Sequence, residues 1–180
     1  IAYTALPNEQ EIWLIPQFLR ALPLFNPNRA AEWASDQPKM DYACRHFLGY
    51  LAVHNLNFMN GWSTRKEGHR FYKIQDELPW DEKVIFHPYW KEGPVRKVSP
   101  STDRVMASAF SREGKALLAV LNDTDREENV VMNVDTKALF GKTGTFQGKD
   151  GFAPADGPFV IRDGRLEVKV PPRGFRFLVF

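Results

Sequence analysis

The chain has 180 residues, of which 43% are hydrophobic and 13% aromatic, enough to bury a sizeable core and too many for a disordered protein. Its 24 basic and 22 acidic residues are interspersed and leave a net charge of +2, which gives no electrostatic reason to expect nucleic acid or an anionic membrane as a partner. The single cysteine, Cys44, excludes an internal disulfide and a cysteine-based metal site, and no apolar run approaches the roughly 20 residues of a membrane helix.

The first residues, IAYTALPNEQ, hold neither an initiator Met nor a signal-peptide pattern, so we interpret the chain as part of a longer polypeptide, the remainder of which is an expected partner. The segment EIWLIPQFL (residues 11–19) fits either a buried strand or a helix, because its apolar run also matches helical spacing. Pro16 would break a helix interior. We therefore predict a strand that ends near Pro16–Gln17, with Gln17 at its carboxyl end.

The clearest predicted element is a helix in DQPKMDYACRHFLGYLAVHN, beginning at Asp36. Asp36 is suited to cap this helix, and Pro38 is tolerated in its first turn. Asp41 and Arg45 stand one turn apart and can form a weak ion pair. The apolar residues at helical spacing, among which Cys44 is expected as a small core residue, are Met40, Cys44, Phe47, Leu48 and Leu51. The helical pattern ends near His54–Asn55.

The run LNFMN (residues 56–60) is predicted as a short strand, after which Ser63 or Thr64 caps a helix that continues to about Glu77. The order strand, helix, strand, helix is typical of a parallel sheet or a (β/α) barrel. We therefore assign residues 1–82 to the C-terminal units of a (β/α) barrel.

From residue 83 onward the pattern changes to short runs rich in β-branched and aromatic residues, separated by turn residues. These runs are KVIFHPYW, PVRKVS, RVMASAF, KALLAVLN, NVVMNV, GTFQG, PFVIRDG, RLEVKV and GFRFLVF. Asp163–Gly164 is a strong signal for a two-residue hairpin, and Leu166, Val168 and Val170 alternate with charged residues in RLEVKV. Eight or nine strands predict an antiparallel β-sandwich over residues 83–180. The fold class is therefore α+β: a partial barrel end with helices, followed by a sandwich.

No compact catalytic motif is present in the sequence, such as a nucleophile elbow, a phosphate-binding loop or a zinc-binding His-Glu-x-x-His. The four histidines, at positions 46, 54, 69 and 87, fall at no metal-ligand spacing. Barrel enzymes place their working groups at the carboxyl ends of strands. Since no acidic residue ends a predicted strand, we assign no catalytic residue. The histidine spacing likewise leads us to expect no metal, and no motif predicts a cofactor.

Polar residues that suit sugar binding do end a predicted strand, at Asn60–Gly61–Trp62. An aromatic face covers the C–H surface of a sugar, and an amide bridges neighbouring hydroxyls. We therefore predict Asn60 and Trp62 as substrate-binding residues, with Asn57, Gln17 and the pair His54–Asn55 as weaker candidates. The alternative is that the asparagines cap helix and strand ends while Trp62 packs in the core.

Tyr89 and Trp90 form a second aromatic pair, in FHPYW at the start of the predicted sandwich. They could form a carbohydrate platform. Because FHPYW also lies where the two halves join, packing between the halves is the favoured interpretation.

Taken together, RHFLGYLAVHNLNFMNGW, FHPYW, KALLAVLNDTDREENVVMNVD and RLEVKVPPRGFRFLVF resemble the C-terminal end of large bacterial glycoside hydrolases, nearest to glycoside hydrolase family 123-like proteins. The resemblance implies a catalytic barrel followed by a β-sandwich, a glycan substrate and a secreted or periplasmic location. It also implies an Asp-Glu pair earlier in the barrel. Asp76–Glu77 and Asp81–Glu82 lie instead in the last helix and the linker, so no catalytic residue is carried over.

We therefore expect a C-terminal part of a glycoside hydrolase-like protein that supplies a cleft wall and a stabilising sandwich, without catalysis of its own. The alternative is a non-catalytic carbohydrate-binding or structural accessory module. For the carbohydrate-binding module we expect an exposed aromatic platform on the sandwich and a helical layer without parallel strands, whereas the structural module would bind no ligand.

Overall fold

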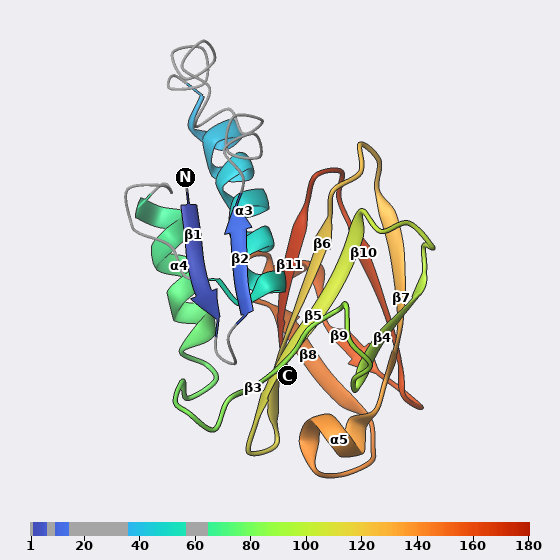
Figure 1. Cartoon of the computed structure of the whole chain (residues 1–180). Helices are drawn as coiled ribbons and strands as arrows, with labels where there is room; N and C mark the ends of the chain where they lie inside the picture. The colour runs from blue at the N-terminus through green and yellow to red at the C-terminus, as the bar shows by residue number, and fades with distance from the viewer. Residues whose placement is uncertain (1, 7–9, 15–35, 57–64) are drawn as a thin grey trace.

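The computed structural model describes residues 2–6, 10–14, 36–56 and 65–180 (Figure 1). The helices are α3 (Gln37–His54), α4 (Arg65–Gln75) and α5 (Thr136–Phe140), with a 3₁₀ turn at Pro154–Asp156. The strands are β1 (Ala2–Leu6), β2 (Gln10–Leu14), β3 (Ile85–His87), β4 (Val95–Ser99), β5 (Val105–Arg112), β6 (Lys115–Asn122), β7 (Glu128–Val134), β8 (Phe146–Asp150), β9 (Phe159–Ile161), β10 (Arg165–Val170) and β11 (Phe175–Val179). No helix in the described ranges is long and apolar enough to span a membrane.

Helix α3 begins and ends where the sequence predicts. The Asp36 carboxylate accepts a hydrogen bond from the Lys39 backbone N–H at 3.1 Å, and Pro38 lies in the first turn. Asn55 ends the helix in a left-handed conformation with φ 55°, so this asparagine is a helix cap. Cys44 is fully buried, as expected for a small core residue.

The N-terminal strands form an antiparallel pair that the barrel prediction did not include. β2 overlaps the strand predicted to end near Pro16–Gln17, and it pairs antiparallel with β1, so that Ala2 is opposite Leu14. Only three residues join the two strands, whereas a parallel pair needs a crossover of about a dozen residues or more. Within the described residues β2 therefore pairs antiparallel, and the parallel partner that the barrel prediction gives it is the run at residues 56–60. The strand predicted at residues 56–60 falls almost entirely outside the described residues.

The predicted sandwich is confirmed, since each of the nine sequence runs contains one strand. The strands form a six-stranded sheet in the order β3-β5-β6-β11-β8-β9 and a three-stranded sheet in the order β10-β7-β4, and all these pairs are antiparallel. β11 follows all other strands in sequence but lies inside the larger sheet, between β6 and β8.

The Asp163–Gly164 turn forms as predicted, but it does not join two neighbouring strands of one sheet. Both residues have positive φ, 50° and 69°, and the backbones of Arg162 and Arg165 exchange hydrogen bonds across the turn. β9 nevertheless pairs with β8, whereas β10 pairs with β7 in the other sheet. The turn therefore links the two sheets at one edge of the sandwich.

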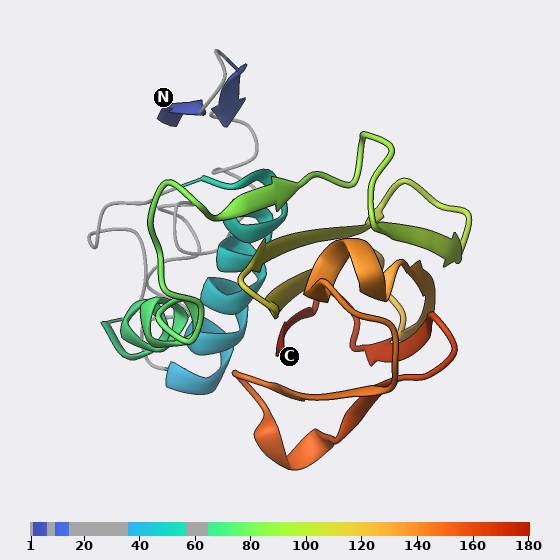
Figure 2. The ribbon, with the colours of Figure 1, turned by 90° about the horizontal axis from the view of Figure 1, so that it is seen from below.

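Three layers result, with α3 and α4 on one face of the six-stranded sheet and the three-stranded sheet on the other (Figures 1 and 2). β5 and β6 are covered on both faces, which explains why their sequences are nearly continuous apolar runs. Towards the helices the six-stranded sheet presents Met106, Phe110, Leu117, Leu121, Phe175 and Phe177. Towards the smaller sheet it presents Val105, Ala107, Ala109, Leu118, Val120 and Leu178.

Ion pairs reinforce the helical layer. Arg45 of α3 contacts Glu67 of α4, and Lys66 contacts Asp41 at 3.0 Å. The pair that the sequence suggested, Asp41 with Arg45, lies within this cluster, where the hydrogen bond to Glu67 raises the Arg45 pKa and the Asp41 charge adds to the shift. The helical layer and the sandwich share one apolar cluster across the predicted domain boundary near residue 82.

Candidate functional site

The four predicted substrate-binding residues, Gln17, Asn57, Asn60 and Trp62, lie outside the described residues, so they remain predictions. The weaker candidates at the end of α3 are described. Asn55 caps the helix, as above, and His54 turns towards Tyr89 and Trp90. Tyr89 and Trp90 belong to a candidate site that lies within the described residues.

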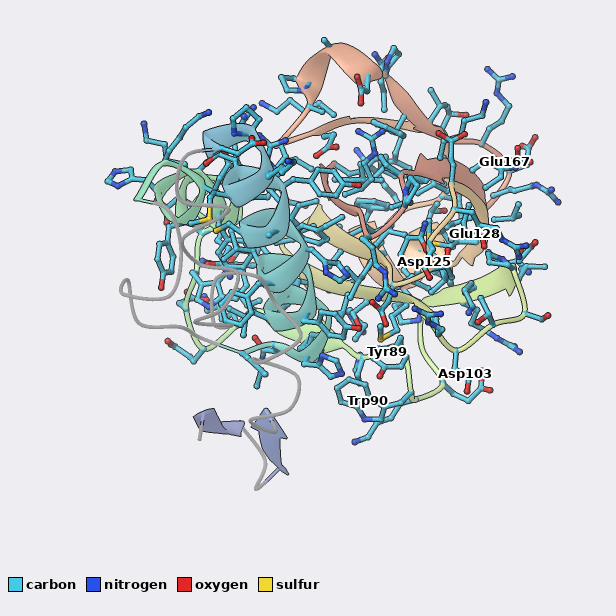
Figure 3. All side chains as sticks on the ribbon, turned by 90° about the horizontal axis from the view of Figure 1, so that it is seen from above. Tyr89, Trp90, Asp103, Asp125, Glu128 and Glu167 are labelled. Carbon is cyan, nitrogen blue, oxygen red and sulfur yellow. The ribbon has the colours of Figure 1, made fainter. Side chains whose placement is uncertain are left out.

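A groove of about 390 Å³ opens beside the Tyr89–Trp90 pair, between β4 and β5. We call it the aromatic groove. Its apolar lining comes from Val95, Val105 and Ala107, and its charged lining comes from Lys91, Glu92, Arg96, Lys97 and Asp103. Figure 3 shows Tyr89 and Trp90 side by side at the edge of the molecule, with Asp103 on the same side. A volume of this size is in the range of small-molecule sites, about 300–1,000 Å³.

The backbone that carries the aromatic pair is held by helix α3. Tyr89 and Trp90 follow β3 in the segment that crosses to β4 in the other sheet. The Tyr89 backbone N–H donates to Ser108 Oγ at 3.1 Å, and the Ser108 hydroxyl donates to the Val53 carbonyl of α3 at 2.7 Å. Ser108 is fully buried, so this relay is shielded from water. The last turn of α3 therefore helps to position the crossover.

His54 contacts the rings of both Tyr89 and Trp90. Its Nδ1 lies 2.8 Å from the Tyr50 carbonyl, which can only accept, so Nδ1 carries the hydrogen. Burial lowers the His54 pKa, which favours the neutral ring with Nε2 as an acceptor, and the Tyr89 hydroxyl donates to Nε2 at 3.2 Å. The Trp90 indole stacks on the imidazole with ring centroids 5.7 Å apart and planes at 24°.

Tyr89 and Trp90 nevertheless stay open to solvent, at 39% and 38% exposed. Trp90 also contacts Tyr89 edge-on, with centroids 5.0 Å apart, and Phe86 at 5.9 Å. The sequence suggested either packing between the halves or an exposed carbohydrate platform for this pair. In the structure Tyr89 and Trp90 pack against α3 and also present aromatic surface beside a groove.

Strand alternation places a charged residue next to the apolar lining of the groove. Val95 and Lys97 lie on the same side of β4, and Val95 belongs to the core between the sheets. The Lys97 ammonium reaches the carbonyls of Thr102 and Val105, the latter at 2.6 Å. Burial lowers the Lys97 pKa, and the nearby Asp103 carboxylate opposes this shift.

Aromatic rings beside fixed polar groups suit a ligand that has both apolar C–H surface and hydroxyls. Tyr89 and Trp90 could be found from the sequence, because two adjacent aromatics at a strand end stand out. Lys97 and Asp103 carried no such signal, since a lysine in a strand and an aspartate in a turn are ordinary surface residues.

Other carboxylates lie elsewhere. Asp125, Glu128 and Glu167, which are also labelled in Figure 3, do not line the groove. Glu128 is instead paired with Arg126, and Glu167 with Arg165. Among the residues that the structure describes, no three His, Cys, Asp or Glu side chains come together as a metal site.

No protein-family model matches the chain, and no curated protein matches it in sequence. Solved structures that match include a candidate alpha-N-acetylgalactosaminidase from Bacillus halodurans C-125, with 14% identity and a TM-score of 0.49, over 78% of this chain and 30% of that one. An Anoxybacillus alpha-amylase matches with 10% identity and a TM-score of 0.48, over 86% and 35%. A glycoside hydrolase family 30 subfamily 8 xylanase from Clostridium acetobutylicum matches with 12% identity and a TM-score of 0.47, over 75% and 38%.

These three structures are described as glycoside-hydrolysing enzymes, one of them as a candidate, and the chain spans about a third of their length. Identities of 10 to 14% with TM-scores below 0.5 do not define a function for this chain. None of the three is described as a family 123 protein, so that narrower resemblance stays a prediction.

Proposed function

We propose that the chain is a non-catalytic, glycan-binding accessory unit of a glycoside hydrolase-like protein. The observation that carries this proposal is the Tyr89–Trp90 pair, whose rings are held by His54 and yet remain more than a third exposed beside the aromatic groove. Rigid, half-exposed aromatic rings bind the C–H faces of sugars without a large loss of side-chain entropy.

The role that the sequence resemblance implies belongs to the same proposal. In it, the sandwich stabilises the end of a (β/α) barrel, and Asn60, Trp62, Asn57 and Gln17 form a wall of the catalytic cleft. Support comes from the apolar cluster that α3 and α4 share with β5, β6 and β11, because a sandwich joined to helices in this way stabilises them. About 300 residues of strand–helix alternation upstream of Ile1 in the gene would support this role, and an initiator Met or signal peptide just before Ile1 would contradict it.

Glycan binding is tested by isothermal titration of the chain with soluble oligosaccharides of several sugar types. We expect at least one to bind, and Trp90→Ala to weaken that binding roughly tenfold or more, as the loss of an aromatic anchor does. Thermal melting checks that the variant is folded.

Trp80→Ala is the matched control. Trp80 is 44% exposed, close to the value for Trp90, but it packs on Phe110 and does not line the groove. Its replacement should leave the affinity within about twofold. Equal losses for both variants, or no binding of any oligosaccharide, would contradict the proposed site.

A further inference from the structure

The chemistry of the groove also indicates which class of sugar it accepts, an inference that rests on the proposed function. Lys97 is the first element. An ammonium has three N–H donors, and two of them serve the carbonyls of Thr102 and Val105. Those carbonyls hold the ammonium at the groove wall and leave one donor for a ligand.

Asp103 is the second element. It is exposed, lines the same groove, and has no hydrogen bond to any side chain or backbone group in the described part of the chain. It sits in the loop between β4 and β5, whose Thr102 carbonyl receives the Lys97 ammonium. A charged acceptor and a charged donor are thus offered close together on one side of the aromatic pair.

We infer that the aromatic groove binds a neutral pyranose that carries two adjacent hydroxyls, one accepting from the Lys97 ammonium and the other donating to the Asp103 carboxylate, while a ring face lies on Trp90. A hydroxyl is both donor and acceptor, so a vicinal diol satisfies this pair of groups in a way that a single charged group cannot.

The remaining charges also disfavour charged sugars. A uronic acid would bring its carboxylate next to Asp103 and Glu92 as well as next to Lys91 and Lys97, and Arg96 in the same lining lies 3.7 Å from Glu92. An amino sugar would bring its ammonium next to Lys91 and Lys97. The lining thus carries charges of both signs, so the charge of either sugar would be attracted by some groups and repelled by others, whereas the hydroxyls of an uncharged ring are repelled by neither sign.

The experiment titrates the folded chain with neutral malto-, xylo- and cello-hexaose, with oligogalacturonate and with chitosan oligosaccharide. We expect a neutral oligosaccharide to bind at least about tenfold more tightly than either charged one. We also expect Asp103→Asn and Lys97→Met to weaken it about tenfold each, as the loss of a charged hydrogen bond does. Lys91→Met, at the exposed rim of the same groove, is the matched control and should change affinity less than about twofold.

The outcomes separate this inference from the proposed function. Tighter binding of oligogalacturonate or chitosan, or loss of binding in Trp90→Ala alone with Asp103→Asn unaffected, overturns the choice of sugar and leaves glycan binding intact. Failure of every oligosaccharide overturns both. The Lys97 ammonium also binds carbonyls of the β4–β5 loop, so Lys97→Met could unfold at a lower temperature. Asp103→Asn, which breaks no hydrogen bond between described residues, then decides the question.

Discussion

Glu67 is a fully buried carboxylate, and Arg45 is the side chain that stabilises it there. Arg45 Nε and one terminal nitrogen donate to the two Glu67 oxygens at 2.6 and 3.2 Å. The hydrogen bond with Glu67 is the main reason that the Arg45 pKa is raised. A bidentate pair of this kind satisfies a charge that burial would otherwise make very costly, so it joins α3 to α4 firmly.

Replacement of Arg45 by Met should therefore destabilise the protein by about 3–5 kcal/mol, because the Glu67 carboxylate would remain buried without its main partner. Urea denaturation measures the change in unfolding free energy. Arg165→Met is the control, since Arg165 and its partner Glu167 are 59% and 53% exposed and such surface pairs contribute at most about 1 kcal/mol. Equal effects of the two substitutions would contradict this account.

The packing of α3 on the sheet depends on a single glycine. A Cβ at Gly49 would lie 2.8 Å from Leu121 Cδ1 and from Phe175 Cγ, closer than carbon atoms can pack. Leu121 lies on β6 and Phe175 on β11, so the helix approaches two strands of the six-stranded sheet at this point. A glycine inside a helix normally weakens it, and here the close contact explains its use.

Gly49→Ala should therefore destabilise the fold, with an overpacking cost of about 1–3 kcal/mol that exceeds the gain in helix propensity of up to about 1 kcal/mol. Gly93→Ala is the control, because a Cβ there would meet nothing closer than 3.9 Å. Its effect should stay within about 0.5 kcal/mol. Thermal melting of both variants measures the difference, and a stabilised Gly49→Ala protein would show that the helix lies farther from the sheet.

The elements that could be predicted from the sequence are those with a local signal. The nine strands of the sandwich and α3 are dense apolar patterns bounded by turns or caps. Helix α5 was not expected, because five residues show no helical period and only its cap, Asp135, marks it. Membership of a sheet has no local signal either, which is why the turn at Asp163–Gly164 was taken for an ordinary hairpin. The same holds for the groove. The Tyr89–Trp90 pair could be recognised in the sequence, whereas the proximity of Lys97 and Asp103 depends on how the fold places β4 and β5.

The molecule as a whole is held together by a polar cluster as well as by its apolar core. Asp123, just after β6, lies 3.3 Å from His46 Nε2, interacts with Tyr50 of the same helix α3, and pairs with Arg173 before β11. Burial raises the Asp123 pKa, but these interactions outweigh it and lower the pKa to about 2. The ionised carboxylate thus links the helical layer to the sandwich.

Acid should weaken this link in a defined range. Because the pKa of Asp123 is lower in the folded protein than its ordinary value of 3.8, the stabilisation is complete above about pH 4 and is lost as the pH falls towards 2. Asp123→Asn should therefore be clearly less stable than the wild type at pH 6, and the difference should shrink between pH 4 and pH 2. Urea denaturation at a series of pH values measures this difference.

The control for the acid series is Asp76→Asn, an exposed acid just after α4. It should change the unfolding free energy little at every pH. A constant difference between Asp123→Asn and the wild type across the series would mean that the charge on Asp123 does not stabilise the fold.

The position of β11 also bears on how the protein is made. The strand lies between β6 and β8, and its Phe175 is opposite Leu121 while its Leu178 is opposite both Leu118 and Asp150. During synthesis β6 and β8 leave the ribosome before β11. Until β11 is available, the edges of β6 and β8 that it later pairs with remain unpaired. Such edges pair readily with other chains. The nascent polypeptide is therefore most prone to aggregation, and most in need of a chaperone, just before residues 175–179 emerge from the exit tunnel.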